Sequence, residues 1–209
     1  MEGRPGPPVR KGFVVRLGSI CVFCGASAGR LPDYAAAARE LGRTIAASGR
    51  QVVFGGGKVG MMGAVADGAL EAGGRVVGVI PEHLVQYEVA HGGLTELHVV
   101  ASMHVRKQMM ADHADAFVIL PGGLGTMEEF FEIWTWGQLG IHRKPYGLLN
   151  VGGYFDPLLA FLQHAVAEGF IRAEHRELLV VEDEPARLLE RLECHPTPAL
   201  PKRLDQSRA

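Results

Sequence analysis

Two kinds of residue that could act on a phosphorylated ligand follow the apolar run 116–120, which we expect to be a buried strand. The first are glycines, which allow the backbone to turn sharply and to approach a ligand without a Cβ clash. They are Gly122, Gly123 and Gly125. If a helix begins at this turn, its free N–H groups and the positive end of its dipole favour a phosphate. The second are the carboxylates Glu128 and Glu129, which we place in the first helical turn. The pattern indicates that the turn holds a phosphate while a carboxylate acts on another part of the same ligand.

A structural role for Glu129 stays open beside the chemical one. Thr126 and Glu129 have the spacing of a capping box, in which Thr126 caps the helix and Glu129 bonds back to the Thr126 N–H. The helix itself is predicted over residues 126–137 from its apolar positions. The motif alone does not choose between capping and catalysis.

Arg106 and Lys107 form a second candidate pair, on a helix expected over residues 104–113. Adjacent residues on a helix point about 100° apart, so one of them can face a pocket while the other flanks it. This helix ends just before the strand that leads to the glycine turn, and ligands of open α/β sheets bind at the carboxyl ends of the strands. We therefore expect Arg106 on the rim of the site, where it could bind a phosphate or carboxylate bidentately. The alternative is a solvated basic face.

Apolar runs and amphipathic stretches alternate along the chain, which predicts an α/β fold: a Rossmann-like, doubly wound parallel sheet of about seven strands in a single domain. We place the domain at residues 19–194, a leader at 1–18 and a tail at 195–209. The predicted strands are 19–24, 51–54, 75–80, 97–100, 116–120, 146–150 and 178–181. The predicted helices are 33–48, 61–72, 104–113, 126–137, 155–168 and 185–191.

The composition excludes several classes of protein. The chain has 209 residues, 47% of them hydrophobic and 21% charged, with a formal net charge of -2. This balance gives no reason to expect nucleic acid or a membrane as a partner, and no apolar run has the length of a membrane span. Cys21 and Cys24 spell C-x-x-C, but Cys21 falls inside a strand, so we expect two core thiols rather than a redox pair. We expect a cytoplasmic protein.

Two earlier glycine-containing turns are further candidates for ligand binding. The turn after the first strand could supply the Ser27 hydroxyl. The turn after the second strand, 55–60, matches G-x-G-x-x-G, and we include Gly56 and Gly57 among the candidate binding residues. The acidic residue that should follow the next strand is represented only by Glu82, which comes after a proline. Residues 81–100 contain His91 and His98, but no set of ligands at metal-binding spacing, so no metal is expected.

Several segments together resemble the LONELY GUY family, whose members are cytokinin riboside 5'-monophosphate phosphoribohydrolases and whose bacterial relatives were often labelled lysine decarboxylases. The segments are S-M-H-V-R-K at 102–107, L-P-G-G-L-G-T-M-E-E at 120–129, I-W-T-W-G-Q-L-G-I-H-R-K-P at 133–145, C-G-A-S at 24–27 and the glycine-rich run 55–70. The resemblance covers residues 19–181. The stretch 91–94 departs from the plant sequences.

The resemblance implies hydrolysis of the N-glycosidic bond between a purine and ribose 5'-phosphate, with no organic cofactor and with a homodimer as the assembly. The catalytic pair falls on Arg106 and Glu129. The positions implied to bind the purine nucleoside 5'-monophosphate are Glu88, Lys107, Gly122, Gly123, Leu124, Gly125, Thr126, Met127, Glu128 and Thr135.

The chemistry also follows from the residues. Cleavage of a ribosyl C–N bond builds positive charge on C1' and the ring oxygen, which an ionised carboxylate can stabilise or attack. The helix N-terminus is expected to keep Glu129 ionised. The sequence leaves open the role of Arg106 and the proton donor to the base, for which Glu88 is one candidate. Two other functions remain: a non-catalytic nucleotide or cofactor carrier, and an NAD(P)-dependent oxidoreductase.

Overall fold

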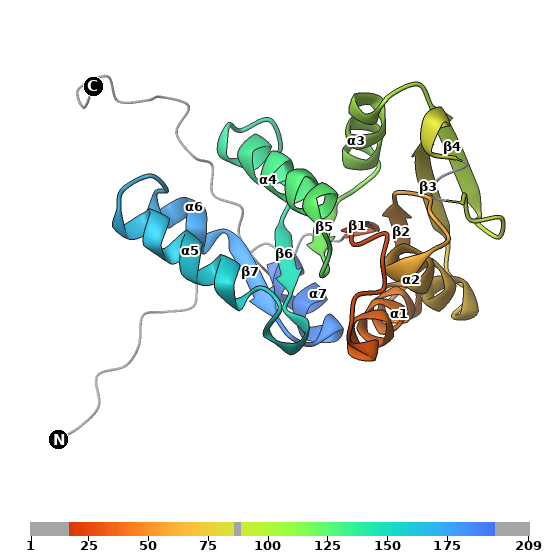
Figure 1. The fold of residues 1–209 in the computed structure, drawn as a ribbon, viewed down its shortest axis with the longest axis horizontal. Helices are drawn as coiled ribbons and strands as arrows, with labels where there is room; N and C mark the ends of the chain where they lie inside the picture. The colour runs from red at the N-terminus through yellow and green to blue at the C-terminus, as the bar shows by residue number, and fades with distance from the viewer. Residues whose placement is uncertain (1–16, 86–88, 195–209) are drawn as a thin grey trace.

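The computed structural model describes residues 17–85 and 89–194. Its centre is one sheet of seven parallel strands in the order β4-β3-β2-β1-β5-β6-β7 (Figure 1). The strands are β1 (Ser19–Phe23), β2 (Gln51–Phe54), β3 (Val76–Pro81), β4 (Glu96–Val100), β5 (Ala116–Ile119), β6 (Tyr146–Leu149) and β7 (Leu179–Glu182). The predicted fold class and all seven strands are confirmed. The short runs rich in Val, Ile and Leu form strands because a parallel sheet buries both of its faces.

Helices cover both faces of the sheet. One face carries α1 (Pro32–Ala47), α2 (Gly60–Glu71) and α7 (Pro185–Cys194). The other carries α3 (Met103–Asp112), α4 (Leu124–Gln138), α5 (Asp156–Ala167) and α6 (Ala173–Glu177). Two short 3-10 helices, η1 (Glu82–Leu84) and η2 (Val151–Gly153), lie in the connections after β3 and β6. The six predicted helices are present, whereas α6, η1 and η2 were not anticipated.

The order of the strands places a topological switch between β1 and β5. From β1 the chain proceeds through β2 to β3, and from β5 it proceeds in the opposite direction to β6 and β7. The loops that leave β1 and β5 therefore diverge, and a crevice forms at their carboxyl ends. This is the part of the fold where the glycine turn after β5 lies.

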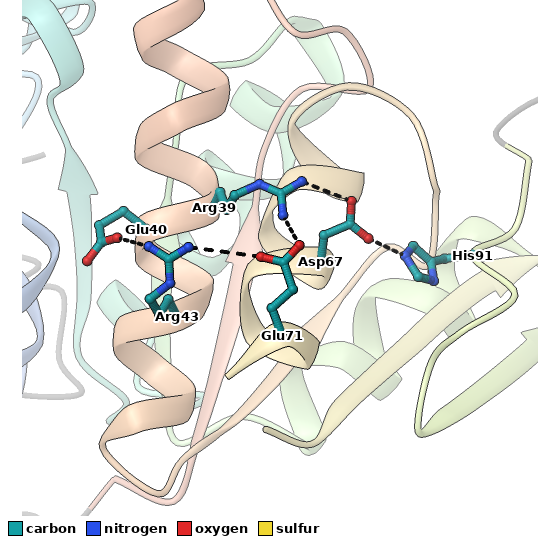
Figure 2. Close-up of polar contacts among 6 residues, drawn as sticks. All are labelled: Arg39, Glu40, Arg43, Asp67, Glu71 and His91. Carbon is teal, nitrogen blue, oxygen red and sulfur yellow. Dashed lines mark hydrogen bonds and ion pairs between the residues drawn. The ribbon is translucent and has the colours of Figure 1, made fainter. Parts of the chain in front are cut away.

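A chain of polar contacts ties α1 and α2 to the segment that follows residue 89 (Figure 2). Arg39 of α1 bonds Glu71 and lies 3.3 Å from Asp67 of α2, and Asp67 in turn contacts the buried His91 at 3.0 Å. The His91 backbone N–H donates to the Gly56 carbonyl at 2.9 Å. His91 thus has a structural partner, and its segment is bonded to the turn after β2.

The start of the chain's ordered core lies slightly before the predicted domain boundary. Leu17 is 2% exposed, and the Gly18 N–H donates to the Asp115 carboxylate at 2.8 Å. The remainder of the predicted leader and the whole predicted tail lie outside the described residues. Within the described part, no helix is both long and apolar enough to cross a bilayer.

Cys21 and Cys24 are both buried thiols, as predicted. Burial raises the pKa of Cys21 well above its usual value, and the nearby negative charge of Glu129 raises it further. A thiol held protonated in this way is a poor nucleophile. The C-x-x-C spacing therefore has no redox meaning here.

Tyr146 offers a test of the packing beneath α4. Its side chain is 2% exposed, its ring lies 6.4 Å from that of Trp134, and its hydroxyl has no hydrogen-bond partner among the described residues. Burial raises the pKa of Tyr146 accordingly. Because an unpaired buried hydroxyl is unfavourable, Tyr146→Phe is expected to increase the free energy of unfolding by about 1 kcal/mol. Urea denaturation of the two proteins measures this difference, and a loss of stability of the same size would mean that the hydroxyl is bonded.

Candidate active site

A cavity of about 530 Å³ lies at the carboxyl ends of β1, β2 and β5, a size typical of small-molecule sites. Its walls come from the loop after β1, the turn after β2, the first turns of α2 and α3, and the glycine turn that opens α4. Of the predicted site residues, it is lined by Ser27, Arg106, Gly122, Gly123, Gly125, Thr126, Glu128 and Glu129. The cavity thus occupies the predicted crevice and brings together most of the predicted chemistry.

The glycine turn places a helix N-terminus at the cavity. Gly123 is the N-cap of α4 and Leu124 its first residue, so the first N–H groups of the helix have no intrahelical acceptor. Gly122 has to be a glycine, because a Cβ atom there would lie 2.2 Å from Thr126 Oγ1 and 2.7 Å from the Gly25 nitrogen. The turn therefore has the close packing and the outward N–H groups that an anion site needs.

The capping box, left open as an alternative by the sequence, does not form with Thr126 as the cap. Because α4 begins at Leu124, Thr126 is the third helical residue rather than the cap, and Glu129 lies in the second turn. The first turn contains no acidic residue, and the cap makes no side-chain hydrogen bond. Two consequences follow: Thr126 and Glu129 do not form the reciprocal box, and the dipole effect, which fades beyond the first turn, gives weaker support for the ionisation of Glu129 than we expected.

Arg106 is held rigidly in the cavity wall. Its side chain is buried at 4% exposure, Nε donates to the Val79 carbonyl at 3.1 Å, and Nη2 donates to the Gly55 carbonyl at 2.9 Å. A Cβ atom on Gly55 would lie 2.0 Å from Nη2, so the glycine makes room for the guanidinium. Two fixed carbonyls orient a planar donor group strongly. Arg106 is therefore a part of the wall, more deeply placed than the rim position we predicted.

Glu129 and Arg106 line the same cavity and also influence the same buried cysteine. Both act on the same buried thiol, since the charge of Glu129 raises the pKa of Cys21 while that of Arg106 lowers it. The two side chains come from helices on the same face of the sheet, α3 and α4. The site therefore holds a cation and an anion together above β1.

Lys107 is not part of the cavity lining. Its ammonium group bonds Glu128 and lies 3.0 Å from Glu132, both on α4. Burial lowers the pKa of Lys107, but the bonds to Glu128 and Glu132 outweigh this effect and raise it. The helix separates Arg106 from Lys107 as predicted, and Lys107 links α3 to α4.

The other predicted residues that the structure describes are not part of the cavity lining. Leu124 is 91% exposed, and the Thr135 hydroxyl donates to the Phe131 carbonyl at 2.7 Å. Met127, Gly56 and Gly57 also lie outside its lining, whereas Gly55 belongs to it. Glu88 lies outside the described residues.

Several lining residues were not anticipated from the sequence. They are Gly25, Ala26, Tyr34, Met61, Met62, Leu84, Met103, Met110 and Tyr154. Met61 and Met62 could have been predicted as lining residues, because they follow a glycine turn at the start of a helix. Tyr34 and Tyr154 carry no local signal, since only the folded chain brings their segments to this edge of the sheet.

The dinucleotide fingerprint at 55–60 has a different use in the structure. The Met61 N–H at the start of α2 donates to the Gly25 carbonyl at 3.1 Å, so the protein itself occupies part of this helix end. Glu82 is exposed in η1 rather than ending β3. Among the described residues, no group of three or more His, Cys, Asp or Glu side chains could hold a metal. The arrangement does not favour a dinucleotide.

Comparison with known proteins assigns the family. Residues 62–192 match the family described as "Possible lysine decarboxylase". The cytokinin riboside 5'-monophosphate phosphoribohydrolase of Rhodococcoides fascians is 53% identical over 78% of this chain and 83% of its own length. The enzyme of that name from Arabidopsis thaliana is 45% identical over 86% of each chain.

Solved structures show the same fold at low sequence identity. The molybdenum cofactor binding protein from Rippkaea orientalis has a TM-score of 0.64 at 23% identity, over 84% of this chain and 94% of that one. The Moco carrier protein from Chlamydomonas reinhardtii has a TM-score of 0.63 at 24% identity, over 85% and 100%. These likenesses concern the fold alone. The family match and the identity to curated relatives go further: the chain belongs to the possible lysine decarboxylase family and, within it, to the group of cytokinin riboside 5'-monophosphate phosphoribohydrolases.

Proposed function

We propose that the protein hydrolyses the N-glycosidic bond of N6-modified adenosine 5'-monophosphates, of AMP, or of both, to the free base and ribose 5-phosphate. The observation that carries the proposal is a single cavity that joins the N-terminus of α4 to the side chains of Arg106 and Glu129. The names of relatives 45–53% identical to this chain support the same reaction.

The 5'-phosphate binds at the glycine turn. The N–H groups at the start of α4 and the positive end of the helix dipole both favour an anion there. Gly123 and Gly125 have open space where a Cβ atom would stand, so a phosphate can approach the backbone. Binding of this remote group positions the sugar for the reaction.

The carboxylate of Glu129 acts on the sugar. As the bond from C1' to the base nitrogen breaks, positive charge develops on C1' and the ring oxygen, and a nearby carboxylate lowers the energy of that state. Water then adds its hydroxyl to C1', and its proton balances the departing base. Direct attack by water and a covalent ester of Glu129 are both compatible with this placement.

Arg106 contributes from a fixed position. Two of its N–H groups are bonded to the carbonyls of Val79 and Gly55, so its charge stays in the wall. A preorganised charge needs no rearrangement during the reaction. We assign it to orienting Glu129 and to stabilising the negative charge that develops on the departing base.

The base is expected on the apolar wall. Met61, Met62, Met103 and Leu84 line the cavity together with the charged pair. Methionine sulfur packs favourably against aromatic rings and adapts to irregular shapes. This wall suits a purine, with or without an N6 substituent.

The direct test is incubation of the purified protein with AMP and with isopentenyladenosine monophosphate, followed by chromatography of the products. We expect free adenine or isopentenyladenine, together with ribose 5-phosphate. Tight binding of both nucleotides without release of base would favour a carrier, and a change in NADH fluorescence on mixing would favour the oxidoreductase.

We further propose a homodimer. A groove between α3 and α4 is lined by Val105, Met109 and Trp136, and the nearby Phe131 and Leu139 are 38% and 63% exposed. A second copy would cover this apolar surface. Sedimentation equilibrium should give a mass twice 22.5 kDa, and a monomer at micromolar concentration would contradict the proposal.

A cytoplasmic location is also proposed, because the buried, reduced thiols of Cys21 and Cys24 fit a reducing compartment. Fractionation of cells that express the protein tests it, and recovery outside the cytoplasmic fraction would contradict it.

A further inference from the structure

Tyr154 contacts the glycine turn from a distant part of the chain. It follows η2, and its hydroxyl donates to the Gly122 carbonyl at 2.6 Å. Both residues line the cavity. We propose that Tyr154 is a positioning residue for phosphate binding: it fixes the peptide that joins Gly122 to Gly123, so that the Gly123 N–H faces the ligand. This role rests on the proposed function, because it assumes that the turn holds the 5'-phosphate.

The argument starts from the planarity of the peptide. In a trans peptide, the C=O of one residue and the N–H of the next point in opposite directions. A donor that holds the Gly122 carbonyl therefore also fixes the direction of the Gly123 N–H. The hydroxyl of Tyr154 is that donor.

The neighbouring carbonyls are occupied in the same manner. The Pro121 carbonyl accepts from the Gly25 N–H at 3.1 Å, and the Gly123 carbonyl accepts from the Met127 N–H at 3.1 Å. Three successive carbonyls of the turn are thus bonded to protein donors. A carbonyl oxygen that turned toward the ligand would repel a phosphate, so this arrangement leaves the turn to present its N–H groups.

The Gly122–Gly123 peptide needs such a restraint more than an ordinary peptide does. The plane of a peptide between two glycines can turn easily, because neither residue has a Cβ atom to limit the φ and ψ torsions on either side of it. Gly122 must nevertheless be a glycine to clear Thr126 and Gly25. The hydrogen bond from the Tyr154 hydroxyl therefore supplies the restraint on the orientation of this peptide that the two glycines lack.

Tyr154 is itself held in place. Its ring packs edge-on against Phe155 at 5.0 Å and against Tyr34 at 5.8 Å. Phe155 is 1% exposed, and its N–H donates to the Asn150 side chain at 2.8 Å. The hydroxyl therefore reaches Gly122 from a ring that two aromatic neighbours position, although Tyr154 is 40% exposed.

The test is Tyr154→Phe, which keeps the ring contacts and removes only the hydroxyl. Binding of ribose 5-phosphate, AMP and adenosine is measured by titration calorimetry on the full chain, and thermal unfolding is recorded beside it. Loss of one hydrogen bond that orients a phosphate donor should weaken ribose 5-phosphate and AMP by about fivefold. Adenosine, which has no phosphate, should bind with unchanged affinity, and the KM for AMP should rise while kcat is nearly kept.

The matched control is Tyr146→Phe, which removes a buried tyrosine hydroxyl outside the cavity and should change none of these affinities. The role is overturned if Tyr154→Phe leaves ribose 5-phosphate binding unaltered, or if it weakens adenosine as much as AMP. Absence of ribose 5-phosphate binding by the unaltered protein would also overturn it. If the unaltered protein releases no base from any nucleotide, yet Tyr154→Phe selectively weakens ribose 5-phosphate, the positioning role stands and the proposed hydrolysis fails.

Discussion

Replacing Glu129 by glutamine is expected to lower kcat for release of base by about 1000-fold, which corresponds to about 4 kcal/mol of transition-state stabilisation. Glutamine keeps the size of the side chain but has no negative charge to place beside C1'. Because Gly123 rather than Thr126 is the cap of α4, no Thr126–Glu129 capping box is lost and the fold should survive the change. Nucleotide affinity should also persist, since the phosphate contacts lie at the glycine turn. Steady-state kinetics and AMP titration measure the two effects separately.

Glu132→Gln is the matched control. Glu132 is on the same helix and bonds Lys107, and the cavity lining does not include it. The same chemical change should therefore leave turnover close to that of the unaltered protein. Near-normal release of base by Glu129→Gln would show that the carboxylate has no chemical role.

Replacing Arg106 by alanine is expected to reduce kcat/KM by about 100-fold or more. The change removes a fixed positive charge from the cavity. It also leaves the carbonyls of Val79 and Gly55 without their donor, which should lower the free energy of unfolding by about 1–3 kcal/mol.

Arg106→Lys separates the two contributions. Lysine restores the charge, but a single ammonium group lacks the planar fork that reaches both carbonyls. We expect partial recovery of activity with incomplete recovery of stability, recorded by kinetics and urea denaturation. Unchanged kinetics in a folded Arg106→Ala variant would remove Arg106 from the site.

The sheet was predictable because most strands are short apolar runs between turn residues, the exception being β4 with Glu96 and His98. The run at β5, for example, is buried at every position and is followed at once by Pro121 and Gly122. Helix ends were less certain: α4 begins two residues before its predicted start because Gly123, not Thr126, is the cap. That small shift is what overturned the capping box. The five-residue helix α6 was missed because it is too short for a periodic pattern.

The site was predictable where function and local sequence coincide. The glycine turn combines backbone freedom with a helix start, and both features can be recognised in the amino-acid sequence. The partners of Arg106 were not, because the carbonyls of Val79 and Gly55 are backbone atoms that any residue carries. The ion pairs of Lys107 were not predictable either, because Glu128 and Glu132 lie 21 and 25 residues away along the chain. Tyr154 depends in the same way on tertiary structure.

The central claim is that the phosphate of a nucleotide binds at the N-terminus of α4 and that this places C1' beside the side chain of residue 129. A crystal structure of Glu129→Gln with AMP tests it most directly. The account predicts the phosphate on the N–H groups of Gly123 to Gly125, with the side chain of residue 129 in contact with C1' or the ring oxygen. A phosphate bound elsewhere, or a side chain at 129 that points away from the sugar, would contradict it.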